Sequence, residues 1–279
     1  MAELSAPKVR EGTAGHWYTI DGAPAYEVCK KDGTGKRPTT LRDARALGLL
    51  PSVTGVLGIL DKPQLVMWKQ KQAILAAREV AMAEGEDLDS WTDRVLAKAE
   101  EPVAEAADLG SRIHGAIETA CAGGRWDQKA LGPYVQPILN WILGKLAAGG
   151  KIVALEDIVV NRTDGYAGRL DIAIKTSDRL VWFIDWKSRK TRPSASDREA
   201  FAPYPTQRLQ LAAYAAIWAN EKGLGWQAVR CANVMTSSTE PGRWGVAEHK
   251  DPEGAYGAFR AVLDIWRWNK AYDPRGRTH

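Results

Sequence analysis

The chain has 279 residues, of which 45% are hydrophobic and 26% are charged, proportions typical of a soluble globular protein with a substantial core. No apolar run approaches the roughly 18 residues of a membrane helix, and the first residues lack the apolar region of a signal peptide, so we expect a cytoplasmic protein. The net charge of +4 is compatible with nucleic-acid binding without establishing it.

The N-terminal part of the chain predicts a hairpin followed by helices. Asp21-Gly22 stands between two short apolar runs and is a strong signal of a hairpin turn. A long helix is expected over residues 63–84, and an acidic, alanine-rich helix over residues 89–107. We therefore expect residues 1–108 to form a hairpin and helical elaboration in front of the main core.

The rest of the chain, residues 109–279, predicts helices and strands that we interpret, together with the elaboration, as one compact domain. The order is helix, helix, three strands, helix, two strands, helix, which indicates an α/β or α+β sheet with helices on its faces. The expected helices span residues 109–122, 133–148, 206–222 and 252–270. The expected strands span residues 152–160, 166–175, 180–188, 226–235 and 243–249.

Two apolar runs separated by a polar break form the most informative part of the sequence. Residues 168–174 and 181–187 are rich in β-branched and aromatic side chains, and the break between them carries turn residues. A hairpin centred on Asp178 places Asp171 opposite Asp185, with Cβ atoms roughly 5 Å apart on one face. Like charges placed there are destabilising, so we expect a divalent cation to neutralise them.

Lys187 adds a positive charge to this arrangement. It lies two residues after Asp185, so the alternation of a strand puts its ammonium group on the same face. Two acids and a lysine around a metal ion are typical of phosphodiester hydrolysis. Two alternatives stay open at this point: Asp and Lys at strand ends usually face solvent, and a hairpin slipped by one residue would turn one carboxylate to the other face.

Further polar residues could complete such a site. His114 and Glu118 share a helix face, although a surface histidine beside an acid is the more ordinary interpretation. Glu156 lies in an expected strand among apolar neighbours, so we interpret it as placed for a partner, with a strand end as the alternative. These residues become informative only together with the two aspartates.

One helix carries neutral polar groups that suit a phosphate. Gln210 and Tyr214 share a face of the helix expected over residues 206–222, with Gln207 one turn earlier. Glutamine and tyrosine donors can hold phosphate or orient a carboxylate. An amphipathic helix boundary explains the same pattern without any function.

A basic run follows the second of the two apolar strands. It contains Arg189, Lys190 and Arg192, in a segment whose prolines predict a loop. Such a loop beside a metal site can hold phosphates without reading bases. A solvated surface charge run is an equally good interpretation.

Four short motifs in this order resemble those of the PD-(D/E)XK nuclease superfamily and, within it, of the RecB-like branch. They are Gly110-Ser-Arg-Ile-His114, Gly168-Arg-Leu-Asp171, Asp185-Trp-Lys187 and Gln210-Leu-Ala-Ala-Tyr214. Each motif is weak alone, but their order and spacing fit over about residues 51–250. The branch includes CRISPR adaptation nucleases, the mitochondrial genome maintenance exonuclease and many phage exonucleases. The resemblance implies a restriction-endonuclease-like α/β core, with a central mixed sheet flanked by helices.

The resemblance also implies a metal centre. Asp171 and Asp185 would bind one or two Mg²⁺ or Mn²⁺ ions, helped by His114 and by the backbone carbonyl of Trp186. Glu156 is a further candidate, as a ligand to a second metal ion or as a support for the first. Carboxylates suit Mg²⁺, and a histidine ligand allows Mn²⁺.

The same resemblance gives roles to the remaining residues. Lys187 would orient the attacking water or stabilise charge on the phosphate, while Gln210 and Tyr214 would position the DNA strand. Gln207, Arg189, Lys190 and Arg192 are additional DNA-binding candidates. DNA, as single strands or duplex ends, is the expected partner, together with a phage single-strand annealing protein, and no membrane is expected.

We expect a metal-dependent DNA exonuclease serving phage recombination or replication. An endonuclease of the same fold, for restriction or junction resolution, is the first alternative, and an inactive DNA-binding relative is the second. Some relatives carry an iron–sulfur cluster. We expect none here, because Cys29, Cys121 and Cys231 are scattered and cannot supply four ligands from one chain.

Overall fold

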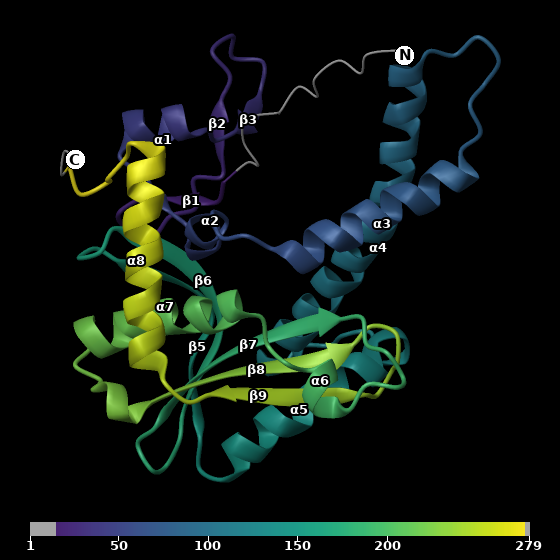
Figure 1. Cartoon of the computed structure of the whole chain (residues 1–279). Helices are drawn as coiled ribbons and strands as arrows, with labels where there is room; N and C mark the ends of the chain where they lie inside the picture. Colours follow the sequence, from purple (N-terminus) through teal and green to yellow (C-terminus); the bar gives the residue numbers. More distant parts are fainter. Residues whose placement is uncertain (1–14, 277–279) are drawn as a thin grey trace. The chain divides into compact units, whose positions relative to one another are not determined.

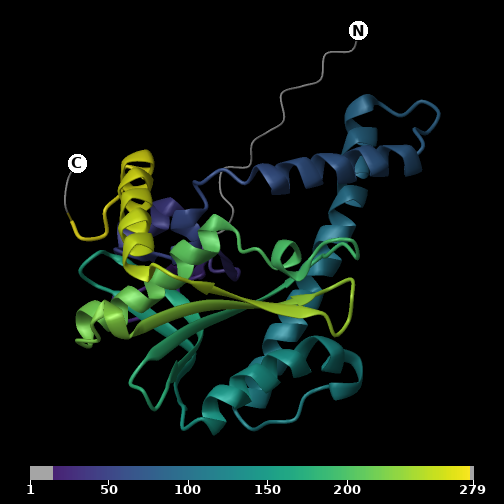
Figure 2. The ribbon, with the colours of Figure 1, turned by 60° about the horizontal axis from the view of Figure 1, so that its bottom comes forward.

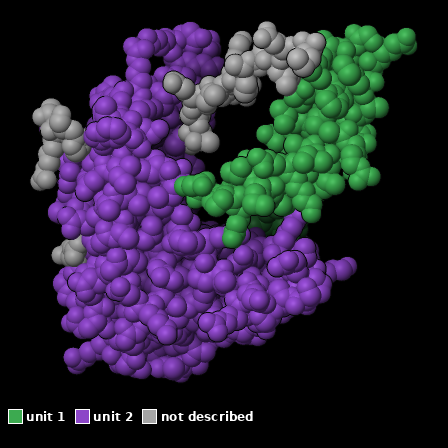
Figure 3. Space-filling view, in the orientation of Figure 1, with its two compact units in different colours: residues 1–11, 61–112 green, residues 12–60, 113–279 purple. Residues whose placement is uncertain are grey.

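The computed structural model describes residues 15–276, so the first residues of the expected elaboration, 1–14, lie outside the described part. It divides into two compact units (Figure 3). The helical unit contains residues 61–112. The sheet unit contains residues 15–60 and 113–276, so the N-terminal hairpin region belongs to it.

The helical unit is a pair of packed helices. Helix α3 (Pro63–Glu79) begins with a proline at its first position, where the missing N–H costs nothing. It packs against the N-terminal part of α4 (Leu88–Cys121) through a small alanine-rich core, and Trp91 Nε1 donates to the Val80 carbonyl at 2.8 Å.

The two helices expected over residues 89–107 and 109–122 are one continuous helix, α4, which contains Pro102. A proline inside a helix loses one backbone hydrogen bond, but strong helix formers on both sides keep the helix intact. Helix α3 ends at Glu79, before the residue 84 expected from the sequence, and the segment that follows makes a loop.

A five-stranded mixed sheet forms the centre of the sheet unit (Figure 1). The strand order is β5-β6-β7-β8-β9, and only β7 and β8 run parallel. This confirms the α/β fold with a central mixed sheet and flanking helices. The strands are β5 (Lys151–Asn161), β6 (Tyr166–Lys175), β7 (Val181–Arg189), β8 (Val229–Ser237) and β9 (Trp244–His249).

Helices cover both faces of this sheet (Figures 1 and 2). Adjacent residues of β7 show the two faces, because Phe183 meets Trp218 of α7 while Trp182 meets Trp141 of α5. The helices of these layers are α5 (Gln128–Ala147), α7 (Pro205–Glu221) and α8 (Pro252–Lys270). Within residues 15–276, no helix has both the length and the apolar composition of a membrane span.

Short elements complete the sheet unit. The turn at Asp21-Gly22 forms, with Ala25 N donating to the Trp17 carbonyl at 2.8 Å. The return segment contains Pro24, which has no N–H, and only one isolated bridge forms there, so β1 pairs instead with β4. These elements are β1 (Trp17–Tyr18), β2 (Glu27–Cys29), β3 (Lys36–Pro38), α1 (Leu41–Leu47), β4 (Leu50–Pro51), α2 (Val53–Leu57), α6 (Asp197–Ala200) and the short 3₁₀ turn Trp226–Ala228.

The hairpin of β6 and β7 has the register that the sequence predicts. Its ladder pairs Ile172 with Ile184 and Ala173 with Phe183, and no slip occurs. The next position along both strands brings Asp171 and Asp185 together. The predicted register of this hairpin is therefore confirmed.

Candidate metal and catalytic site

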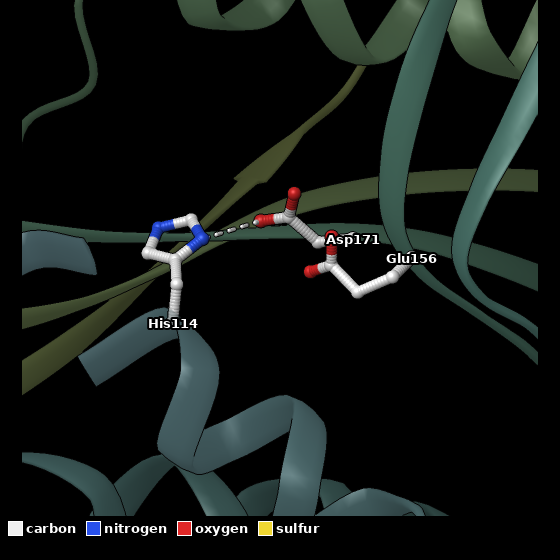
Figure 4. A group of neighbouring side chains, drawn as sticks. All are labelled: His114, Glu156 and Asp171. Atoms are coloured by element: carbon white, nitrogen blue, oxygen red, sulfur yellow. Dashed lines mark ion pairs between the residues drawn. The ribbon is translucent and has the colours of Figure 1, made fainter. Parts of the chain in front are cut away.

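Three side chains converge near the end of the β6–β7 ladder (Figure 4). His114 comes from α4, Glu156 from β5 and Asp171 from β6, and all three belong to the sheet unit. One ligand atom of each lies within 4.8 Å of the others, and His114 Nδ1 is 3.8 Å from Asp171 Oδ2. We call these three residues the acidic group.

Trp186 contacts two members of this group, one through its backbone and one through its ring. Its N–H donates to Asp171 Oδ2 at 3.1 Å, just beyond the last pair of the β6–β7 ladder. The indole ring of Trp186 also meets the His114 imidazole edge to face, with centroids 5.9 Å apart. The aspartate and the histidine are thus held from the neighbouring strand.

Glu156 reaches the group through an unusual backbone conformation. Its φ is +47°, a left-handed value that non-glycine residues seldom adopt inside a strand. The pairing of β5 with β6 also shifts by one residue between Ile152 and Ala154. Such strain persists where the surrounding structure enforces it, and it is common at functional sites.

A neighbouring arginine contacts Glu156 from β6. Arg169 Nε lies 3.0 Å from Glu156 Oε2 and donates to the Glu156 carbonyl at 3.2 Å. The Arg169 side chain is 55% exposed, whereas that of Glu156 is only 13% exposed. Arg169 therefore places a solvent-facing cation beside the acidic group, a contact that the sequence alone did not indicate.

The acidic group is electrostatically unbalanced. Burial raises the pKa of Asp171 well above its usual value, and nearby Asp185 adds to the rise. Burial likewise raises the pKa of Glu156, against the opposing effect of Arg169. Burial and Lys187 together lower the pKa of His114 to about 4, so its imidazole is neutral at pH 7. Two carboxyl groups whose ionisation is disfavoured and a neutral imidazole form a donor set, and a bound cation would stabilise its ionised form.

Asp185 points to different partners. Its carboxylate, in a residue that is 1% exposed, accepts from Lys187 Nζ at 2.5 Å and from Asn233 Nδ2 at 2.7 Å. Asn233 Oδ1 in turn lies 2.8 Å from His249 Nε2. We call Lys187, Asp185, Asn233 and His249 the hydrogen-bond chain. Asp185 is not among the residues whose ligand atoms meet within 4.8 Å.

Lys187 is charged at this position. Burial alone would lower the pKa of its ammonium group, but Asp185 and Asp171 outweigh that effect and the pKa is raised. Asp171, Asp185 and Lys187, which the sequence predicts to share a site, thus lie close enough for both aspartates to raise the pKa of the lysine.

Asn233 and His249 are the polar residues that sequence reasoning missed. Asn233 lies in a buried run of β8, between Ala232 and Val234, and it is opposite Asp185 in the parallel ladder. A polar residue inside an otherwise apolar strand is the signal that could have revealed it. His249 ends β9 and is 4% exposed.

The helix motif is packed against the strand that carries Asp171. Tyr214 is 3% exposed, its hydroxyl accepts from Gln210 Nε2 at 3.3 Å, and its ring lies against Gly168. A Cβ at Gly168 would lie 2.5 Å from Tyr214 Cε1, which explains the need for glycine there. Gln207 caps the start of α7, where its Oε1 accepts from Tyr204 N at 2.8 Å.

The basic run is anchored to the rest of the sheet unit. Arg189 donates to the Ala202 carbonyl at 2.6 Å and stacks over Tyr204, so its guanidinium is held by the protein. Lys190 and Arg192 are exposed on either side of buried Thr191. The hydroxyl of Thr191 bonds to that of Ser237 at 2.5 Å.

Searches of known proteins give similarities at low identity. No curated protein matches the chain. Among solved structures, SSO0001 is similar with a TM-score of 0.33 and 12% identity, over 75% of this chain and 87% of that one. An alkaline exonuclease from Laribacter hongkongensis is similar with a TM-score of 0.27 and 13% identity, over 58% of this chain and 82% of that one.

A family comparison is more informative. The model of the PD-(D/E)XK nuclease superfamily matches residues 73–256, which is more than half of the chain. The matched segment contains the whole sheet, the acidic group and the hydrogen-bond chain. The chain therefore belongs to the PD-(D/E)XK nuclease superfamily.

Proposed function

We propose that this protein is a Mg²⁺- or Mn²⁺-dependent deoxyribonuclease that digests DNA from its ends. The observation that carries the proposal is the acidic group, which gathers two carboxylates and a neutral imidazole beside the ammonium group of Lys187. Digestion from ends, a role in phage recombination or replication, and an annealing-protein partner are supported by the RecB-like motifs alone.

The residues of the acidic group fit a hard divalent cation. Asp171 and Glu156 supply oxygen ligands, and His114 supplies the nitrogen that Mn²⁺ tolerates. We propose that they hold the ion together with the backbone carbonyl of Trp186, and that Asp185 joins them. When bound, such an ion lowers the pKa of a coordinated water and stabilises negative charge on phosphate oxygens.

The protein's own groups would orient the reaction around that ion. Lys187 holds a proton on Nζ and presents positive charge to the phosphate, where charge develops during the attack. Asp185 fixes the position of this ammonium group. We further propose that Gln210 supports the substrate strand near the site, while buried Tyr214 orients the Gln210 amide.

A digestion series tests this function. End-labelled linear, nicked, covalently closed circular and single-stranded DNA are incubated with Mg²⁺, with Mn²⁺ or with a chelator. We expect metal-dependent loss of linear DNA and survival of closed circles. Cleavage of closed circles would replace the proposal with an endonuclease. Binding of DNA without cleavage in either metal would identify an inactive relative.

A further inference from the structure

Beyond the acidic group, Asn233 and His249 form a buried polar pair that has no role in the proposed reaction. Asn233 is 0% exposed and lies in a buried, largely apolar part of β8, and His249 is 4% exposed at the end of β9. Burying two such groups costs free energy unless each is hydrogen-bonded, and apolar side chains would pack there at lower cost. Their presence in this part of the sheet calls for a specific reason.

The hydrogen bonds of this pair can run in only one direction. An ionised carboxylate accepts and never donates, so Asn233 must present its Nδ2 to Asp185 Oδ2, at 2.7 Å. Asn233 Oδ1 is then left to accept from His249 Nε2, at 2.8 Å. His249 therefore carries its proton on Nε2.

The surroundings of His249 maintain this single arrangement. Burial, assisted by Arg208, lowers the pKa of His249 to about 4, so the imidazole is neutral at pH 7. A neutral imidazole with its proton on Nε2 donates a hydrogen bond to Asn233 Oδ1. This bond fixes the Asn233 amide so that its Nδ2 donates to Asp185. The far oxygen of Asp185 accepts from Lys187 at 2.5 Å, which completes the hydrogen-bond chain.

We propose that Asn233 and His249 are positioning residues, which fix the Asp185 carboxylate in the orientation that holds Lys187 at the site. The proposal rests on the proposed nuclease function for its consequence. Neither residue touches the substrate in this scheme, and both act through Asp185. Residues that orient a site from outside its first layer typically contribute 10- to 100-fold to metal affinity or to activity.

Two amide substitutions at one position provide a matched test. His249→Gln places an amide nitrogen near the position of Nε2, so it can still donate to Asn233. His249→Asn has a side chain one methylene shorter and cannot reach. We expect His249→Gln to remain within about 3-fold of the wild type, and His249→Asn and Asn233→Leu to lose about 10- to 100-fold in kcat or in Mn²⁺ affinity.

Three measurements decide the outcome: kcat on linear DNA, Mn²⁺ affinity by calorimetry without DNA, and folding by circular dichroism. Equal values for the Gln and Asn variants would overturn the proposal, whether both match the wild type or both fall. Unfolding of the Asn variant alone would assign the pair to stability and overturn it as well. If the wild type cleaves no DNA, the proposed function fails, and Mn²⁺ affinity still decides this inference.

Discussion

The carboxylates of the acidic group and the residues of the hydrogen-bond chain lie on adjoining strands of one sheet, yet their charges are balanced in different ways. In the acidic group, the pKa values of Asp171 and Glu156 are raised because buried carboxylates lack sufficient compensation. In the hydrogen-bond chain, Asp185 receives an ammonium group and an amide, and each partner is oriented. The protein thus compensates the charge of Asp185 internally, whereas the partners of the carboxylates in the acidic group do not offset the effect of burial.

The largest effect is expected when a carboxylate is removed from the acidic group. Asp171→Asn is expected to reduce cleavage by more than about a thousandfold, because the negative charge is lost and one ligand oxygen becomes an NH₂ group. The metal-free variant should melt at the same or a higher temperature than the wild type, because repulsion with Asp185 is relieved. DNA cleavage and thermal melting in a chelator measure the two effects.

The exposed neighbour Asp157 offers a matched control for this change. Asp157→Asn removes the same charge from β5 and should retain wild-type cleavage. Wild-type turnover by Asp171→Asn at saturating Mg²⁺ would remove Asp171 from the metal site.

The hydrogen-bond chain is tested by removing the ammonium group of Lys187. Lys187→Ala is expected to lower the single-turnover cleavage rate by about two to four orders of magnitude, the range typical of losing one group at a reacting centre. Mn²⁺ affinity should change little or rise, since a nearby positive charge is gone. Lys175→Ala, an exposed change on β6, serves as the control. A variant that loses Mn²⁺ binding but recovers full cleavage at high Mn²⁺ would show that Lys187 is structural.

Acid stability gives a third test, at the end of the hydrogen-bond chain. The native pKa of His249 is about 4, against 6.5 for an ordinary histidine. Between these values the unfolded chain binds a proton that the native protein does not, so stability falls as the pH decreases from 6.5 to 4. This loss amounts to at most about 3 kcal/mol. His114, whose pKa is also about 4, contributes a loss over the same range, so denaturant titrations in a chelator should show a steeper loss in the wild type than in His249→Gln. Parallel pH profiles for the two proteins would contradict the assignment.

The smallest expected effect concerns the packing behind Asp171. Gly168→Ala must displace the ring of Tyr214, and we expect it to lower the free energy of unfolding by about 1–3 kcal/mol. Gly132→Ala in α5 is the control, because an added Cβ there meets no atom within 4 Å and should stabilise the helix by about 0.5–1 kcal/mol. Chemical denaturation measures both; similar shifts in the two variants would show that Tyr214 can move freely.

The sequence allowed the hairpin at the centre of the site to be predicted because its register follows from local pattern. Alternating apolar residues and one turn are enough to predict Asp171 beside Asp185, and the β6–β7 ladder, which ends one pair earlier at Ile172 and Ile184, confirms the register. The same local reasoning predicted α8 over the residues that form it. It was wrong about α4, because two helices were expected over residues 89–107 and 109–122 and the structure has one continuous helix.

Long-range features could not be predicted in this way. The contact between Asn233 and Asp185 depends on β8 running parallel to β7, which no local pattern determines. The approach of Glu156 depends on a shift of pairing in β5 and on one left-handed residue. The internal contacts of Arg189 depend on the fold of the following loop, so its charge alone suggested an exposed residue.

The parallel pairing of β7 with β8 also has a consequence for how the protein is made. The β6–β7 hairpin closes over a short turn, whereas the Asn233–Asp185 bond joins residues 48 positions apart. Local hairpins form quickly, and distant pairings form later because a long loop must first close. During synthesis both aspartates therefore leave the ribosome well before the amide that orients one of them. We expect the Asp185 carboxylate of the nascent chain to reach its native orientation only after β8 has been added and the sheet has assembled.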